Sequence, residues 1–496
     1  MKKSGLLLFA ILSCYSATAQ EPTATNPFNE KDSVQISGKI IGYKPGQGDH
    51  FITFSTYDLR GKPTNQAIQV KENGDFWIKL YQPLEGDMLL NYRDAFIDIY
   101  TKPGTAIRLE INNDKISEER NNEDAVVAFG QFAALNNLLF RFNKAFAKQK
   151  FSEVNMGDKS QSDSLYAARK MDQLQEQLNF LDVFVKQHQV HDQFFINWKK
   201  NELQYKAGID ILFFPFAGKF NNKIVQSQLL KMIRAIPINN PEALNNSAYY
   251  AFLKMLSADQ EIMVNINPSY DLAKQQAGNS IDLYLNEIDK FSNGLSKDIL
   301  HYNVLLDKAS FVKDTLAWER QVKTISNPFL RQKLIEAKAK TSNGFASFAI
   351  LERLQKLKAS RSLKQRLISL FTQTKGTNLY IDFWGDWCGP CMAEMPNYPR
   401  LIDGFKGKPI KFLFLSTFTT EENMLAVKKK YGINAEFVNL NKDEVAILNN
   451  VFEFHSYPSH FLVNSQGRVV ANASGAIAEG AIGEKVQAFE KILNRK

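Results

Sequence analysis

The sequence of 496 residues has only three cysteines, Cys14, Cys388 and Cys391, so no network of disulfides can hold the fold together. After the first 20 residues it also lacks any stretch that approaches the roughly 20 apolar residues of a membrane-spanning helix. Its central part contains no Gly-rich phosphate loop, no fixed repeat and no metal-ligand spacing. We therefore expect a soluble mature protein that is stabilised by packing.

The composition is that of a folded protein with several domains. Hydrophobic residues make up 44% of the chain and charged residues 23%, which allows a large core and excludes a disordered protein. At roughly 150 residues per domain, the length suggests about three domains. The net charge of +9 is spread along the chain, and its densest cluster, residues 428–430, falls where a solvated helix end is expected. We therefore expect no binding to nucleic acid.

Residues 1–19 have the organisation of a cleaved secretory signal. Two lysines precede an apolar run over residues 6–12, and the small-residue tripeptide Ala17-Thr18-Ala19 stands before Gln20. We expect cleavage after Ala19 and export to the periplasm. The alternative is a lipoprotein, because Ile11-Leu12-Ser13-Cys14 resembles a lipobox in which Cys14 would carry the membrane anchor.

The region over residues 31–115 has the rhythm of an antiparallel β domain. Short segments of alternating polarity are separated by turn signals such as Asn73-Gly74-Asp75. The segments lie at residues 34–37, 51–54, 76–80 and 107–111. We predict a β-sandwich-like domain here.

In the region over residues 124–360 the apolar residues recur at helical spacing, as in Leu165, Ala168, Met171 and Leu174. This pattern predicts a central all-α domain. Its aromatic residues, including Phe194, Phe195, Phe213, Phe214 and Phe216, either fill the core between helices or line a docking groove. The residues assign no chemistry to this domain.

Strands and helices alternate over residues 362–496, which predicts an α/β sheet with helices on both faces. Helices are expected at residues 391–405, 421–431, 443–452 and at the C-terminus, and strands at residues 379–384, 410–416, 436–440, 461–463 and 469–471. The first strand leads into Trp384-Gly385-Asp386-Trp387-Cys388-Gly389-Pro390-Cys391. This spacing places Cys388 at a helix N-terminus, where free amides and the helix dipole stabilise a thiolate. Cys391 lies one turn further on, close enough to form a disulfide with Cys388.

Residues 382–384 together with Trp387-Cys388-Gly389-Pro390-Cys391 resemble the active-site signature of the thioredoxin superfamily, and Pro396 matches the proline that kinks its active-site helix. Tyr457-Pro458-Ser459 is similar to the cis-proline loop of that family, with Ser459 where threonine is usual. The insert before Pro458 and the position of Glu394 resemble the exported TlpA and ResA branch. The turns at residues 74–76 and 103–105 resemble those of the β domain that often precedes such proteins. The resemblance implies a C-terminal thioredoxin fold and a thiol-disulfide oxidoreductase.

The resemblance also implies a role for each site residue. Cys388 would attack a substrate disulfide and Cys391 would resolve the mixed disulfide. Asp382 matches the buried aspartate of thioredoxin and Glu394 the glutamate of ResA-like proteins, so both are candidate general bases for Cys391. A solvated position on its helix is the alternative for Glu394. We expect Trp387, Tyr457, Pro458 and Ser459 to bind the substrate chain, and we expect no cofactor.

Three other interpretations of the two cysteines compete with redox chemistry. A structural zinc site needs four ligands, and only His455 and His460 could join the cysteines. A peroxiredoxin would carry threonine three residues before its peroxidatic cysteine, but Gly385 stands there. A thioredoxin fold that serves only for binding would most simply have lost one cysteine. Redox chemistry is therefore the prediction.

The direction of electron transfer follows from the residues between the cysteines. Gly-Pro is the pair found in thioredoxin, whose reduction potential is about −270 mV. The oxidant DsbA has a reduction potential of about −120 mV. We expect a reductase that acts on protein disulfides. The resemblance implies a membrane thiol donor of the DsbD or CcdA kind and substrates such as cytochrome c precursors. The alternatives are a disulfide isomerase that forms a homodimer through its N-terminal region, and a binding or scaffold protein with an auxiliary redox domain.

Overall fold

The computed structural model describes residues 28, 33–46, 49–93, 95–116, 124–155, 161–213, 235–258, 281–308, 315–342, 346–454, 456–472, 477 and 482–493. Residues 1–19, which include Cys14, lie outside the described residues, and so does His455. The expectations about them stay predictions. No described helix combines the length and the apolar character that crossing a bilayer requires.

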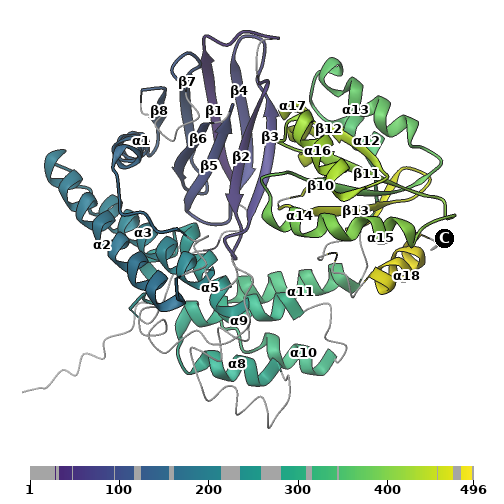
Figure 1. The fold of residues 1–496 in the computed structure, drawn as a ribbon. Helices are drawn as coiled ribbons and strands as arrows, with labels where there is room; N and C mark the ends of the chain where they lie inside the picture. Colours follow the sequence, from purple (N-terminus) through teal and green to yellow (C-terminus); the bar gives the residue numbers. More distant parts are fainter. Residues whose placement is uncertain are drawn as a thin grey trace, which may run out of the picture.

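The N-terminal region is rich in sheet (Figure 1). Its strands are β1 (Ser33–Ile41), β2 (Phe51–Tyr57), β3 (Pro63–Gln69), β4 (Asp75–Tyr81), β5 (Gly86–Tyr92), β6 (Ala95–Thr101), β7 (Ala106–Asn112) and β8 (Val126–Gly130). They form two four-stranded sheets, in the orders β4-β1-β7-β8 and β3-β2-β5-β6. All described pairings are antiparallel except that of β1 with β7.

The two sheets share one apolar core because each strand alternates its side chains between two faces. Ile36 of the first sheet and Phe54 of the second both belong to this core. In β5, Met88 and Leu90 are buried, whereas Leu89 between them lies on the opposite, outer face. Each large apolar side chain buried in this way contributes about 1.5–3 kcal/mol to stability. The outer face of the second sheet remains available for other contacts.

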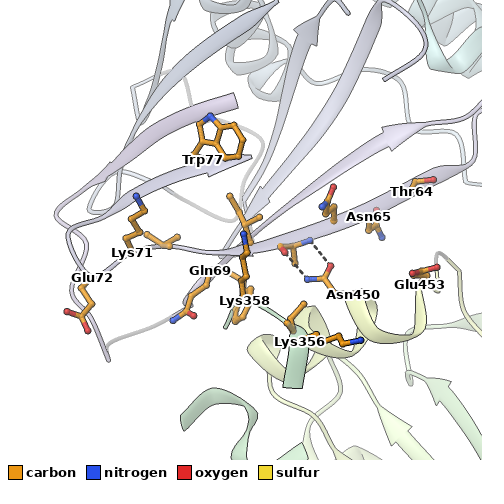
Figure 2. A pocket seen from close by; sticks show the side chains of 16 residues that line it. Thr64, Asn65, Gln69, Lys71, Glu72, Trp77, Lys356, Lys358, Asn450 and Glu453 are labelled. Carbon is orange, nitrogen blue, oxygen red and sulfur yellow. Dashed lines mark hydrogen bonds between the residues drawn. The ribbon is translucent and has the colours of Figure 1, made fainter. Parts of the chain in front are cut away.

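Asparagine side chains cap three of the four edge strands of these two sheets. An exposed edge strand leaves backbone groups unpaired, and an asparagine amide can replace a neighbouring strand by donating one hydrogen bond and accepting another. Asn136 and Asn137 of α1 (Ala133–Lys148) bond in this way to the backbones of Tyr100 in β6 and Ala128 in β8. Asn450 bonds to the backbone of Ala67 in β3, at 3.0 and 2.8 Å (Figure 2). These contacts attach neighbouring helices to the sheets.

The middle of the chain is helical and lies below the sheets in Figure 1. It contains α2 (Asp163–Gln187), α3 (Gln193–Phe213), the short 3-10 helix η2 (Pro241–Ala243), α5 (Ser247–Ala258), α8 (Ile281–Asp289), α9 (Gly294–Lys308), α10 (Thr315–Val322) and α11 (Pro328–Ser342). Phe195 is buried in the same core cluster as Trp198, whereas Phe194 and Phe213 are exposed. Phe214 and Phe216 lie outside the described residues.

The C-terminal region has a six-stranded sheet in the order β12-β11-β10-β13-β14-β9. Its strands are β9 (Phe348–Ala349), β10 (Asn378–Trp384), β11 (Ile410–Ser416), β12 (Glu436–Asn439), β13 (Ser459–Val463) and β14 (Arg468–Asn472). Strands β10, β11 and β12 are parallel, and β13 is antiparallel to β10. The helices are α12 (Ile350–Lys356), α13 (Arg361–Gln373), α14 (Gly389–Glu394), η3 (Met395–Asn397), α15 (Tyr398–Asp403), α16 (Glu421–Tyr431), α17 (Lys442–Phe452) and α18 (Ile482–Leu493).

Two domain boundaries differ from those expected at residues 115–124 and 360–362. Strand β8 pairs with β7, so the sheet-rich region extends to Gly130. Strand β9 pairs with β14, and Ile350 and Leu354 of α12 pack in the same core as Leu379. The C-terminal region therefore begins near residue 348. Helical periodicity identifies α12 as a helix but does not show which core it joins.

The helix expected over residues 391–405 is also interrupted. It consists of α14, the 3-10 turn η3 and α15. Pro396 lies inside this turn, and a proline ring has no N–H to donate and clashes with the preceding helical turn. The helix is therefore interrupted at Pro396, where the family resemblance implied a kink.

The sheet-rich region contacts the C-terminal region through α17. Phe51 of β2 and Ala67 of β3 join the apolar core that α17 covers. His50 Nδ1 lies 2.7 Å from Asp443 Oδ2, and the backbone N–H of His50 donates to Oδ1 of the same carboxylate. This interface brings the outer face of the second sheet close to the end of β10, where the two cysteines follow.

Candidate active site

Cys388 and Cys391 form a disulfide whose Cα atoms lie 5.3 Å apart. Cys388 is the N-cap residue of α14, and its Sγ accepts a hydrogen bond from the backbone N–H of Cys391 at 3.2 Å. Both side chains are buried, Cys391 more fully than Cys388. The N-cap position supplies the unpaired amides that would stabilise a thiolate on Cys388 after reduction.

The loop before Cys388 is fixed by hydrogen bonds to the loop after β11. The indole Nε1 of Trp387 donates to the carbonyl of Thr417 at 3.0 Å, and Thr419 Oγ1 donates to Asp386 at 2.9 Å. Gly385 is required here because a Cβ atom at this position would lie only 2.3 Å from Trp387 Nε1. Trp387 is thereby held beside the disulfide with 53% of its surface exposed.

The loop before β13 contains the cis peptide bond expected between Tyr457 and Pro458. The rings of Tyr457 and Trp387 meet edge to face, with their centroids 5.1 Å apart. Ser459 is buried, and its hydroxyl donates to the carbonyl of Ser456 at 2.5 Å. The hydroxyl of Ser459 is therefore engaged within the loop, while Trp387 and Tyr457 line the surface beside the disulfide.

Asp382 and Glu394 are both buried, and His460 lies between them. His460 Nε2 is 3.4 Å from Asp382 Oδ1 and 3.2 Å from Glu394 Oε2. The other oxygen of Glu394 accepts a hydrogen bond from the backbone N–H of Ile477 at 3.1 Å. Glu394 therefore does not occupy the solvated position that was the alternative.

Two buried tyrosines extend this network. The hydroxyl of Tyr398 donates to Asp382 Oδ2 at 2.6 Å, and the hydroxyl of Tyr380 lies 3.5 Å from that of Tyr398. Burial, together with the charge of Asp382, raises the pKa of both phenols well above its usual value, so both stay protonated. Cys391 packs in the same buried cluster as these two rings.

His460 supplies the positive charge of the network. Its burial alone would lower the pKa of the imidazole, but the charge of Asp382 and the close contacts with both carboxylates outweigh burial and raise that pKa to about 9. His460 is therefore an imidazolium at neutral pH. Such a charge between two buried carboxylates compensates for their loss of hydration.

Sequence reasoning considered His460 only as a zinc ligand and missed this role. The only signal in the sequence was the position of His460, two residues after Pro458, and its role becomes visible in the pairing of β13 with β10. In that pair His460 stands directly opposite Asp382, and residues opposite each other on one face have neighbouring side chains. Among the described residues, no group of three or more His, Cys, Asp or Glu side chains could hold a metal ion.

Comparisons with known proteins find similarity in the C-terminal region, which contains Cys388 and Cys391. A model of the AhpC/TSA family matches residues 352–472. ResA, a thiol-disulfide oxidoreductase, is 28% identical in Bacillus subtilis (strain 168) over 108 residues, and 29% identical in Bacillus anthracis over 101 residues. The C-terminal region is a thioredoxin-like domain. These alignments cover 22% and 20% of this chain, and 59% and 57% of the ResA chains, which is less than two thirds of their length.

Two solved structures are also similar to this domain. One is the thioredoxin domain of a thiol-disulfide oxidoreductase from Bacteroides vulgatus, with 25% identity and a TM-score of 0.22, covering 25% of this chain and 84% of that one. The other is a thiol:disulfide interchange protein from Bacteroides sp., with 24% identity and a TM-score of 0.22, covering 25% of this chain and 77% of that one.

The structure also has a hollow of about 970 Å³ away from the disulfide. It lies between strand β3 and the segment after α12, and Figure 2 shows Trp77, Lys358 and Asn450 around it. Its lining includes no cysteine or histidine. The hollow therefore offers no thiol or imidazole for redox or proton-transfer chemistry, in contrast to the surroundings of Cys388 and Cys391.

Proposed function

We propose that this protein is an exported thiol-disulfide oxidoreductase that reduces protein disulfides. The observation that carries the proposal is the pair Cys388 and Cys391 at the N-cap of α14, beside the cis Pro458. The similarity of the surrounding domain to ResA supports the same chemistry. The Gly-Pro pair between the cysteines favours the reducing direction.

Two thiol exchanges complete the reaction. In the reduced protein the thiolate of Cys388 attacks one sulfur of the substrate disulfide, which breaks that bond and releases the other sulfur as a thiolate. The thiol of Cys391 then loses its proton and attacks Cys388 Sγ. This second step releases the remaining substrate thiolate and forms the Cys388–Cys391 disulfide, so two electrons pass from the protein to the substrate.

The buried network supplies candidate groups to accept the proton of Cys391. Asp382 and Glu394 are candidate acceptors, as their positions in the sequence led us to expect. His460 acts as a positioning residue, since its charge holds the two carboxylates on either side of one nitrogen. Removing either carboxylate would leave the other in contact with His460.

The N-terminal sequence and the family resemblance support the rest of the proposal. The signal-like residues 1–19 favour action in the periplasm, where a reductase needs an external source of electrons. A membrane thiol protein of the DsbD or CcdA kind would supply them. Oxidised cytochrome c precursors are one class of protein disulfide that such an enzyme would reduce.

Reduction of insulin by the full chain, with dithiothreitol as electron source, tests this function. We expect catalysed precipitation of the insulin B chain, and none with the Cys388→Ser variant. No rate above dithiothreitol alone would overturn the proposal. A parallel assay with scrambled ribonuclease tests the isomerase alternative, which predicts recovery of ribonuclease activity without added reductant.

A further inference from the structure

A groove of about 360 Å³ lies between the sheet-rich region and the thioredoxin-like domain, and Trp387, the residue before Cys388, is part of its lining. The outer face of the second sheet lines one side of the groove with Thr53, Asn91 and Phe96. The thioredoxin-like domain lines the other side with Trp387, Phe418 and Tyr457. Its volume falls within the range of about 300–1,000 Å³ that is usual for ligand clefts.

Strand register brings the sheet residues together in one row. Thr53 of β2 stands opposite Asn91 of β5, and Asn91 stands opposite Phe96 of β6. Residues opposite one another point to the same face of a sheet. Phe96 is 42% exposed, although it is a large apolar residue in the middle of a folded region. The row therefore offers hydrogen-bonding side chains beside an accessible aromatic ring.

The facing wall also presents aromatic rings to solvent. Phe418 is 56% exposed, and its backbone has a φ of 51°, a left-handed conformation that side chains other than glycine rarely adopt. The neighbouring Thr417 is held by the hydrogen bond from Trp387 Nε1. Strained conformations of this kind persist only where the surrounding structure enforces them, and they cluster at binding sites.

The charged residues that line the groove all have partners. Asp443 pairs with His50 at 2.7 Å, and Lys442 lies 3.9 Å from Asp49. The guanidinium of Arg93 donates to the backbone carbonyl of Asn113 at 3.1 Å. The row of Thr53, Asn91 and Phe96 carries no charge. Such a surface suits the neutral amides and apolar side chains of a polypeptide better than a charged small molecule.

We propose that this groove binds an extended polypeptide segment that flanks the disulfide of a protein substrate, with an apolar side chain packed against Phe96 and Phe418. The inference rests on the proposed function, because the groove is continuous with Trp387 and Tyr457 beside the disulfide. Trp387 directly precedes Cys388, so a substrate whose sulfur reaches Cys388 lies near this wall of the groove. The sheet-rich region then contributes to the choice of substrate.

Substitution of Phe96 in the full chain tests the groove. Phe96→Ala should lower kcat/KM for insulin about ten-fold through KM, because burial of an aromatic ring against a partner is lost. The reaction of the reduced protein with 5,5′-dithiobis(2-nitrobenzoate), which has no flanking chain, should not change. Phe418→Ala, on the other wall, should act in the same way. The control is Phe129→Ala, since Phe129 is a similarly exposed phenylalanine on β8 of the other sheet.

A binding measurement keeps this test separate from the redox activity. Fluorescence anisotropy with S-alkylated insulin B chain, which has no disulfide, should show about ten-fold weaker binding to Phe96→Ala than to Phe129→Ala. Equal binding by both variants would overturn the proposed binding role of the groove, even if the protein reduces insulin. If Phe96→Ala loses binding but the unsubstituted protein reduces no disulfide, the proposed function is refuted while the binding role of the groove is supported. Conversion of a dimer to a monomer by Phe96→Ala would make a second copy the occupant and would also overturn the inference.

Discussion

The regions beneath and beside the Cys388–Cys391 disulfide differ in their exposure to water. Beneath it, Asp382 and His460 are each 1% exposed and form a closed set of charges. Beside it, Trp387 and Phe418 are more than half exposed and line an open groove. Under the proposed function, proton transfer would belong to the buried region and substrate recognition to the exposed one.

This division has a consequence for stability. Removing one partner of a buried charge pair leaves the other without hydration or a partner, which costs about 3–5 kcal/mol. Removing an exposed side chain usually changes stability by less than about 0.5 kcal/mol. Substitutions beneath the disulfide should therefore change both folding and chemistry, whereas substitutions in the groove should change binding alone.

The largest effect should come from the cysteines, which lie where the two regions meet. Cys388→Ser should abolish disulfide exchange, because only the N-cap thiol begins the attack. Cys391→Ser should instead accumulate mixed disulfides between Cys388 and the substrate. Non-reducing electrophoresis and mass spectrometry of the full chain with insulin would measure both outcomes, and equal trapping by the two variants would contradict the assigned roles.

The next effect concerns the two carboxylates. Asp382→Asn or Glu394→Gln alone should slow resolution of the mixed disulfide only modestly at neutral pH, because the other carboxylate remains beside His460. The two together should slow it by about 10²-fold or more, which is the size of a lost general base. Single-turnover resolution rates against pH would measure this. A single variant as slow as the double one would assign the proton to that residue alone.

His460 should control how stability depends on pH. Its pKa of about 9 in the folded protein lies above the usual 6.5, so the stabilisation that it provides is complete below pH 6.5 and is lost as the pH rises through 9. Urea unfolding of the oxidised protein across that range should show this decline. His460→Gln should lower stability by about 3–5 kcal/mol at the acidic end and remove most of the decline. An unchanged decline in His460→Gln would show that another group titrates.

The smallest effect should come from the contact that holds the sheet-rich region in place. Asn450→Ala leaves the backbone N–H and carbonyl of Ala67 without their partner, which should cost about 1–3 kcal/mol. It should also raise KM for insulin, because one wall of the groove is loosened. Asn449→Ala, one position earlier on α17, is the control for stability alone, since Oδ1 of Asn449 accepts no hydrogen bond from the described residues but its side chain lines the groove. Equal thermal stability of the two variants would show that this contact does not support the groove.

The sequence was informative where chemistry depends on residues close together in the chain. The disulfide between Cys388 and Cys391, the strand before it and the cis bond at Pro458 each have a local signature, and the structure contains all three. His460 was missed because its role depends on the register of β13 against β10, which no short motif reports.

The arrangement of the domains was harder to predict for the same reason. Nothing near Phe96 or Asn450 in the sequence indicates that β6 and β3 lie beside the thioredoxin-like domain. That placement depends on contacts between residues nearly 400 positions apart, such as His50 with Asp443. Local periodicity also assigned α12 to the wrong domain, because a helix of either domain shows the same apolar spacing.

A stoichiometric reaction of the reduced full chain with insulin tests the central claim most directly. After one turnover without added reductant, mass spectrometry should find Cys388 and Cys391 joined in a disulfide, and each such disulfide should be matched by two new insulin thiols. Insulin thiols without this disulfide, or cysteines that stay reduced in the presence of excess insulin, would contradict the account.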